Sequence, residues 1–152
     1  MREAEQLCLL VVAGGMHRVG IPLASVRETM RPLALEPLRG TPSFVLGLAI
    51  IRGASVPVVD LGALFGHATA STNVRRFVTL ELEGRSVALA VSAVEGVRAL
   101  DSRDFSAMPP LFARAAGEAI EALTLHDAGL LFVLSATRLV PHLPNRSEEA
   151  HP

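Results

Sequence analysis

Short apolar segments separated by turn residues recur along most of the chain. A continuous apolar run over Leu7–Ala13 has the length of a buried strand, and Gly14–Gly15 marks a turn before a second strand over Met16–Ile21. Proline suits the first position of a helix, because its missing N–H has no partner there, so Pro22 predicts a short helix-like segment over Leu23–Met30. The start of the chain therefore predicts two strands followed by one short helical segment.

The middle of the chain continues with short strands and turns. Val45–Arg52 and Ser55–Val59 are predicted strands, and Gly53–Ala54 is the predicted turn between them. Asp60 follows the second strand, and its carboxylate is suited to accept from the free N–H groups of a short helix over Leu61–Phe65. This segment predicts a hairpin that ends in a capped helical turn.

The second half of the chain follows a similar plan. Strands are predicted over Phe77–Leu82, Ser86–Val91, Gly96–Leu100, Glu118–Leu125 and Gly129–Leu134. A loop is predicted over Asp101–Pro110, and Ser135 is positioned to cap a last short helix over Ala136–Val140. Helix propensity also allows a helix over Leu111–Ala122, an alternative that overlaps the fourth of these strands.

The two halves match each other without gaps. Val12, Val19, Ile21 and Val26 match residues 68 positions later, and Val56, Val58, Asp60 and Leu64 match residues 75 positions later, namely Leu80, Val87, Leu89, Val94, Leu131, Val133, Ser135 and Leu139. We infer two similar halves, roughly residues 7–66 and 74–141, within a single domain over residues 1–141. A chance likeness between β-rich segments is the alternative. Residues 142–152 contain Pro, Asn, Ser and Glu and predict a flexible C-terminal tail.

The length and the strand pattern favour one compact all-β domain. A chain of 152 residues fits one ordinary domain, and half of its residues are hydrophobic, which is enough apolar material for a core. Short strands with frequent turns favour small closed barrels, because closure removes exposed strand edges. The predicted fold class is therefore all-β, with a few short helices.

Charge and cysteine content exclude several classes of protein. The net charge is −1, all 14 basic residues are Arg, and Trp and Tyr are absent, which argues against nucleic-acid binding. The single cysteine, Cys8, lies in an apolar run, so we expect it to be buried in a protein of a reducing compartment. The longest apolar runs, such as Phe44–Ile51, are too short to span a bilayer, so no direct membrane insertion is expected.

No pattern of residues predicts catalysis, a metal site or a cofactor. One Cys and five dispersed His residues offer no zinc-ligand spacing, and the absence of Lys removes the lysine of an ordinary phosphate-binding loop. Asp101 and Asp104 lie three residues apart and are a candidate acid–base pair, although a solvated turn or a helix start is the favoured interpretation. Glu81 and Glu83 flank a predicted hairpin turn and are interpreted as solvated edge residues. The sequence therefore predicts a protein that is not an enzyme.

One nearly uncharged segment stands out. Between Thr41 and Val74 only Arg52 and Asp60 carry charge at neutral pH. An arginine in apolar surroundings is typical of protein interfaces, because its planar guanidinium binds carboxylates and is weakly hydrated. The alternative is a strand-end arginine whose aliphatic stem covers core residues. On physical grounds alone both interpretations of Arg52 stay open.

Residues 47–61 read GLAIIRGASVPVVDL, and this segment resembles the signature of the CheW-like family. The usual form of that signature is Gly-Leu/Val-x-Asn-Leu-Arg-Gly, three variable positions, and then Pro-Val-x-Asp-Leu. The resemblance covers the chain from Leu7 to about Val140, and Val26–Glu28 and Thr41–Pro42 also fall where the family has counterparts. One position departs from the pattern, since Ile50 stands where the family usually has Asn.

The resemblance implies a fold and a function. Members of this family consist of two small five-stranded SH3-like β-barrels packed around a shared core, and they catalyse nothing. They bind the regulatory domain of a CheA-type histidine kinase and the cytoplasmic tip of a methyl-accepting chemotaxis receptor. The resemblance therefore implies a cytoplasmic chemotaxis adaptor, without a cofactor, that is recruited to membrane receptor arrays.

The resemblance also implies roles for individual residues. Arg52 is carried over as a receptor-binding residue, and Val26 and Glu28 are carried over to the same groove. The structural positions of the signature are Gly47, Gly53, Pro57 and Asp60.

Two other functions compete with this one. A stand-alone CheW-like interaction module in another motility, developmental or second-messenger pathway would share the fold, and the departure at Ile50 keeps that alternative open. A small enzyme or ligand-binding barrel is disfavoured, because catalysis needs poised groups and the sequence shows none.

Overall fold

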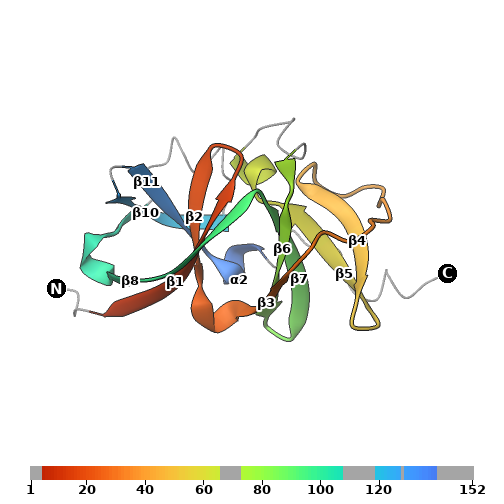
Figure 1. The fold of residues 1–152 in the computed structure, drawn as a ribbon, viewed down its shortest axis with the longest axis horizontal. Helices are drawn as coiled ribbons and strands as arrows, with labels where there is room; N and C mark the ends of the chain where they lie inside the picture. Colours follow the sequence, from red (N-terminus) through yellow and green to blue (C-terminus); the bar gives the residue numbers. More distant parts are fainter. Residues whose placement is uncertain (1–4, 66–72, 108–118, 128, 140–152) are drawn as a thin grey trace.

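The computed structural model describes residues 5–65, 73–107, 119–127 and 129–139, and these form two β-sheets with a few helical turns (Figure 1). The first sheet has the strand order β8-β1-β2-β11-β10-β9. Its strands are β1 (Gln6–Gly14), β2 (His17–Pro22), β8 (Ala93–Asp101), β9 (Ser106–Ala107), β10 (Ile120–His126) and β11 (Gly129–Leu134).

The second sheet has the strand order β3-β6-β7-β5-β4. Its strands are β3 (Val26–Met30), β4 (Val45–Ile51), β5 (Ala54–Asp60), β6 (Arg76–Leu82) and β7 (Arg85–Val91). The helical turns are η1 (Leu23–Ser25), η2 (Gly62–Phe65), η4 (Ser102–Asp104) and α2 (Ala136–Leu139). The prediction of an all-β fold with a few short helices is confirmed, whereas the predicted tail over residues 142–152 lies outside the described residues.

The third strand of each half pairs with a strand of the other half. β3 follows β2 along the chain but pairs with β6, where Val26 lies opposite Leu80. β8 follows β7 but pairs with β1, where Val94 lies opposite Val12, and it crosses the middle of the molecule in Figure 1. All four residues belong to the set that recurs after 68 positions, so two equivalent crossings connect the sheets.

The closing hairpin of each half also pairs with the other half. β5 pairs in parallel with β7, with Val58 opposite Ala88, and β11 pairs in parallel with β2, with Val133 opposite Gly20. Because Val133 follows Val58 by 75 positions and Ala88 follows Gly20 by 68, the two parallel pairings share one register. Each sheet therefore contains strands from both halves of the sequence.

Within the described residues, three apolar clusters form the core, one between the sheets and one against the inner face of each sheet. β7 shows how one strand serves two of them. Val87, Leu89 and Val91 point into the cluster shared by both sheets, whereas Ala88 and Ala90 point into the cluster of the second sheet. A strand buried on both faces needs a continuous apolar run rather than an alternating one.

The helix-like segment predicted over Leu23–Met30 is largely wrong. Only Leu23–Ser25 forms a 3₁₀ turn, and Val26–Met30 forms β3. Pro22 does start the turn, but Val26 and Thr29 are β-branched and favour an extended chain. In β3 the backbone groups of these residues pair with β6, and a helix over the same residues would break that pairing.

The turn between β4 and β5 lies one residue earlier than predicted. Its two residues are Arg52 and Gly53, with φ angles of 52° and 79°, and Ala54 is already the first residue of β5. Two-residue hairpin turns favour positive φ at both central positions, because that twist matches the twist of the strands. Glycine at the second position meets this need, and Ala54 would meet it poorly.

The prediction that Cys8 is a buried core residue is wrong, since Cys8 is exposed. It lies near the start of β1, where Leu7 packs toward the apolar cluster of the first sheet and its neighbour Cys8 faces solvent. Burial on both faces of β1 begins at Leu9. An apolar run can therefore extend beyond the part of a strand that both layers cover.

Three smaller predictions also need correction. The predicted loop over Asp101–Pro110 contains η4 and the short strand β9 within its described part. Glu81 is not on an edge strand, because β6 lies between β3 and β7. Of the alternative helix over Leu111–Ala122, residues 111–118 lie outside the described residues, and Ile120–His126 forms β10.

Candidate functional site

Arg52 lies at the tip of the hairpin formed by β4 and β5. Its backbone adopts a positive φ of 52°, which is uncommon for a residue with a side chain. The side chain is 76% exposed, so it leaves the apolar interior of the second sheet and reaches into solvent. The hairpin thus presents a cation at the end of the sheet.

The guanidinium of Arg52 forms a two-pronged ion pair with the carboxylate of Glu28. Nε donates to Oε1 at 2.9 Å, and Nη2 donates to Oε2 at 2.8 Å. Glu28 lies on β3, and Arg52 follows β4; these are the two edge strands of the five-stranded sheet. The pair therefore requires the sheet to curl until its edges approach each other.

The ion pair fixes the charge state of both groups. The hydrogen bonds from Arg52 hold the pKa of Glu28 below its usual value, although partial desolvation opposes this effect. The carboxylate in turn raises the pKa of Arg52. Both side chains are therefore charged at neutral pH, and they offer polar contacts of fixed geometry to an approaching surface.

Val26 stands two residues before Glu28 on β3 and is partly buried. Its side chain packs against the apolar cluster shared by the two sheets. A register shift lies between Val26 and Glu28 in the pairing with β6, so the strand bends at this point. The structure therefore brings Arg52 and Glu28 into contact and places Val26 on the same strand as Glu28, beside the shared core.

Gly47 has a structural reason to be glycine. Its φ is 148°, and an added Cβ would lie 2.4 Å from the carbonyl oxygen of Glu36. Glu36 approaches this closely because its N–H and C=O both pair with the backbone of Leu48 at 2.8 Å. Gly47 therefore lets the segment around Glu36 cover β4, whereas Gly53 has open space around it and is needed for its positive φ.

Pro57 and Asp60 follow Arg52 along β5 and are both buried. Pro57 lies opposite Leu48, whose backbone N–H and C=O pair with Glu36, so the missing N–H of proline removes no bond from the β4–β5 pair. Asp60 caps η2, since its Oδ1 accepts from the N–H of Ala63 at 3.3 Å. Burial raises the pKa of the Asp60 carboxyl, and the backbone donors of η2 oppose that rise.

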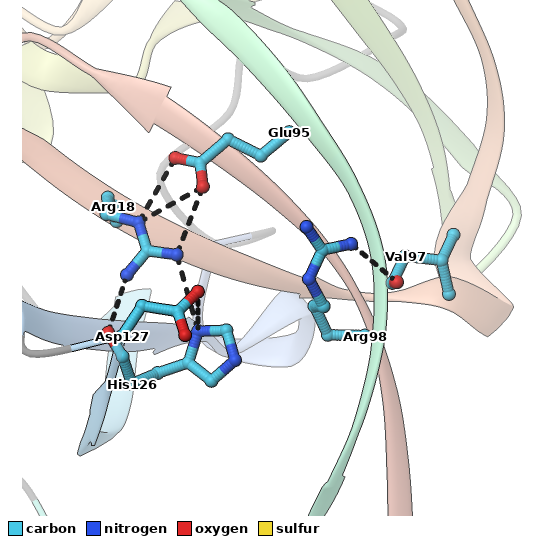
Figure 2. Close-up of polar contacts among 6 residues, drawn as sticks. All are labelled: Arg18, Glu95, Val97, Arg98, His126 and Asp127. Atoms are coloured by element: carbon cyan, nitrogen blue, oxygen red, sulfur yellow. Dashed lines mark hydrogen bonds and ion pairs between the residues drawn. The ribbon is translucent and has the colours of Figure 1, made fainter.

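The first sheet carries a polar network at its own hairpin end (Figure 2). Arg18 of β2 donates to the Glu95 carboxylate of β8 at 3.0–3.3 Å and to the carbonyl of His126 at 3.0 Å. Nη2 of Arg18 also lies 3.3 Å from Nδ1 of His126. The hydrogen bond to Glu95 raises the pKa of Arg18, so this arginine is a permanent cation that ties β8 to the β10–β11 hairpin.

The two hairpin ends occupy equivalent positions but expose opposite charges. Asp127 follows Arg52 by 75 positions, and it has a φ of 53° against 52° for Arg52. Its side chain is 73% exposed, close to the 76% of Arg52. The same turn thus presents an anion on the first sheet and a cation on the second.

Comparison with known proteins identifies the family. The sequence model of the CheW-like domain matches residues 7–143. The chain belongs to the CheW-like family. A chemotaxis protein CheW from Rhizobium meliloti is 29% identical over 104 residues, covering 68% of this chain and 67% of the relative. Protein FrzA from Myxococcus xanthus is 35% identical over 117 residues, covering 76% and 71% of the two chains.

A solved structure supports the same fold. The scaffolding protein TtCheW from Thermoanaerobacter tengcongensis matches with a TM-score of 0.74 at 22% identity, covering 86% of this chain and 85% of that one. The all-β fold with two subdomains, predicted from the resemblance, is confirmed. The CheW-like family and these relatives show a scaffolding role in chemotaxis signalling, and family members in general couple chemoreceptors to the kinase CheA.

Arg52, Glu28 and Val26 of this CheW-like site were predicted from the sequence, but the polar groups that contact β3 were not. Thr79 Oγ1 accepts from the N–H of Glu28 at 3.2 Å, and Arg27 pairs with Glu81 at 2.8 Å. Thr79 and Glu81 lie 51 and 54 residues along the chain from the residues they contact, and no local pattern marks them. The repeat equates β3 with β8 and β1 with β6, but it does not show that β3 pairs with β6.

The departure at Ile50 lies on the surface of β4. Ile50 is 63% exposed, opposite Ser55, whereas its neighbour Ile51 is buried. The substitution of an apolar residue for the usual Asn therefore changes the surface beside Arg52 and leaves the interior of the sheet unchanged.

The candidate acid–base pair has a structural explanation. The carboxylate of Asp101 caps η4 by accepting from the N–H of Arg103 at 2.9 Å and also pairs with its guanidinium at 2.8 Å. These contacts hold the pKa of Asp101 below its usual value. The helix-start interpretation of Asp101 is confirmed.

Among the described residues, no cluster of three or more His, Cys, Asp or Glu side chains could hold a metal ion. No described helix is long and apolar enough to cross a membrane.

Proposed function

We propose that this chain is a cytoplasmic coupling protein that binds the tip of a methyl-accepting chemoreceptor and the regulatory domain of a CheA-type histidine kinase. The observation that carries the proposal is the ion pair between Arg52 and Glu28, presented at an exposed hairpin end in a member of a scaffolding family. The protein acts by binding both partners at once and catalyses no reaction.

Arg52 is the proposed receptor-binding residue, and Glu28 and Val26 belong to the same contact. Glu28 holds the guanidinium in one orientation, so less side-chain entropy is lost when a partner docks. A receptor tip built as a helical hairpin presents an amphipathic helix, and such helices dock through apolar anchors beside a few fixed polar groups. Val26 provides the apolar part and Arg52 the polar part.

The experiment is a pull-down with the wild-type protein and an Arg52→Glu variant, against the receptor tip and the kinase regulatory domain of the same organism. We expect the wild type to retain both partners and the variant to lose only the receptor. Arg103→Glu is the matched control, because Arg103 is also exposed and paired with a carboxylate. Failure of the wild type to retain either partner would refute the proposal.

One observation favours a second function. The exposed Ile50 gives the surface beside Arg52 an apolar character where the usual signature has a polar residue. A CheW-like module of another motility, developmental or second-messenger pathway would present such a changed surface to different partners. The alternative is supported if the wild-type protein does not bind the receptor tip and the Ile50→Asn variant does.

A further inference from the structure

An open hollow of about 430 Å³ is lined by residues of both sheets. Its walls come from the residues after β3, the start of β6 and the junction of β7 with β8. They include Pro32, Val74, Arg75, Arg76, Ala93 and Val94. Volumes of 300–1,000 Å³ are typical of ligand pockets, so the hollow is large enough to hold side chains of a partner.

Arg75 and Arg76, here called the arginine pair, give the hollow its charge. They are the only adjacent basic residues in the sequence, and both side chains are exposed. Arg18, Arg27 and Arg52 each pair with a carboxylate, but no ion pair within the described part of the chain includes either member of the arginine pair. The hollow therefore presents two cations that carboxylates of the described residues do not neutralise.

Hydrogen bonds connect the residues of the hollow to both sheets. The N–H of Arg75 donates to the carbonyl of Val91 at 2.9 Å, which fixes the start of β6 on β7. Both the N–H and the Oγ of Ser92 donate to the carbonyl of Ala13, at 2.8 and 3.0 Å, which fixes the β7–β8 junction on β1. A partner in the hollow would thus contact residues of both sheets.

The hollow is the counterpart of the surface around Val26. Val94 lies on the hollow and follows Val26 by 68 positions, at the start of the equivalent crossing strand. At the positions equivalent to the arginine pair, the first half has Leu7 and Cys8. At these matched positions, only the second half of the chain carries two adjacent arginines.

We propose that the arginine hollow is a second docking site for the same partner, and that it binds an acidic segment of the chemoreceptor tip beyond the Arg52 contact. This inference rests on the proposed function. The arginine pair selects carboxylates, and Val74 and Val94 provide an apolar wall for a neighbouring side chain. A single amphipathic helix with two acidic residues on one face meets both requirements.

The distance between the two sites suits one helix. Pro32, on the rim of the hollow, follows Glu28 by four residues, so the two are at most about 13 Å apart along an extended chain. A helix rises 1.5 Å per residue, so about nine residues of one helix span this distance. In this proposal one receptor helix lies along β3, with Arg52 and Glu28 toward one end and the hollow beside Pro32 toward the other.

The test measures the affinity of the receptor tip from the same organism for an Arg75→Glu/Arg76→Glu variant of the full chain, by fluorescence anisotropy. We expect affinity to fall about tenfold or more, with a weaker dependence on salt than in the wild type, because charge complementarity is lost. Arg39→Glu/Arg138→Glu is the control; both arginines are exposed, and the change in net charge is the same. Val94→Asp, which places a carboxylate on the wall of the hollow, should also weaken binding.

Each outcome decides the proposal. Unchanged affinity in the arginine-pair variant, with normal binding by the wild type, overturns the second site and leaves the proposed function intact. An equal loss in the control variant also overturns it, since net charge would then explain the effect. The same titration is repeated with the kinase regulatory domain, and loss of kinase binding instead of receptor binding overturns the assigned partner. A wild type that does not bind the receptor tip overturns both proposals.

Discussion

Arg52 and Glu28 join the two edge strands of a five-stranded sheet, because Arg52 directly follows β4 and Glu28 lies on β3 at the opposite edge. Their two hydrogen bonds, at 2.8 and 2.9 Å, place a cation of fixed orientation at the end of the second sheet. The same contact holds the edges together and presents the residue proposed to bind the receptor. Binding and stability can be separated by mutation, since both side chains reach solvent.

Arg52→Ala is expected to weaken binding of the receptor tip at least about fivefold, as the loss of an interface hot spot does. Its thermal unfolding midpoint should stay close to that of the wild type, because exposed ion pairs contribute little to stability. Isothermal titration and a thermal melt measure the two effects on one sample. Arg103→Ala should change neither, and a large drop in melting temperature for Arg52→Ala would favour the structural interpretation of Arg52.

Gly47→Ala should destabilise the fold more than Gly53→Ala does. Both glycines have positive φ, which costs about 1–3 kcal/mol for other residues, but only Gly47 also faces the backbone of Glu36. Urea denaturation of the two variants measures the difference. Equal losses of stability would show that the segment around Glu36 moves aside without cost.

Asp60 makes the stability depend on pH in a direction opposite to that of an ion-paired carboxylate. Burial raises its pKa in the folded state above its unfolded value, so the folded state binds the proton more tightly. The stability gained from this proton is present below the unfolded pKa and is lost as pH rises through the folded pKa. At pH 7 the buried, charged carboxylate of Asp60 therefore lowers the free energy of unfolding.

Asp60→Asn should remove the destabilisation caused by the buried charge and keep an acceptor for the N–H of Ala63. The variant is expected to gain stability relative to the wild type between pH 4 and pH 7, as measured by urea unfolding at each pH. Asp60→Ala is the control, and it should lose about 1 kcal/mol through loss of the cap. A constant difference between Asn and Asp at all pH values would contradict the raised pKa.

Leu89→Ala is expected to cost about 2–5 kcal/mol of unfolding free energy, because Leu89 is fully buried between the two sheets. Leu125→Ala removes the same atoms from a side chain that is 75% exposed, and it should change stability by no more than about 0.5 kcal/mol. Guanidinium denaturation measures both. A near-neutral Leu89→Ala would show that the shared core tolerates the cavity by collapsing around it.

Arg18→Met should loosen the β10–β11 hairpin while leaving the sheets folded. Arg18 ties His126 to Glu95, and methionine keeps the apolar stem but donates no hydrogen bond. Hydrogen exchange at the amides of Leu125 and Leu130 should accelerate, since local opening becomes easier. Arg98→Met is the control, because Arg98 donates to the carbonyl of its neighbour Val97, and its loss should not affect the hairpin.

Local patterns in the sequence predicted most of the strands, most turns and the cap at Asp60. These features depend on residues that are close in the chain: apolar runs, Gly at turns, and a carboxylate next to free N–H groups. It also revealed the repeat, because equivalent positions of two similar halves bury similar side chains. The resemblance over residues 47–61 added the family and named Arg52, Glu28 and Val26.

The tertiary structure alone decided which strands pair and which side chains meet. β3 reads locally as part of a helical segment, and only pairing with β6 makes Val26–Met30 a strand. Cys8 belongs to an apolar run, but the coverage of β1 begins at Leu9 and leaves Cys8 exposed. The contact of Arg52 with Glu28 exists because the second sheet curls until its edges meet, and curling depends on contacts between residues far apart in the chain, which no local pattern of residues records.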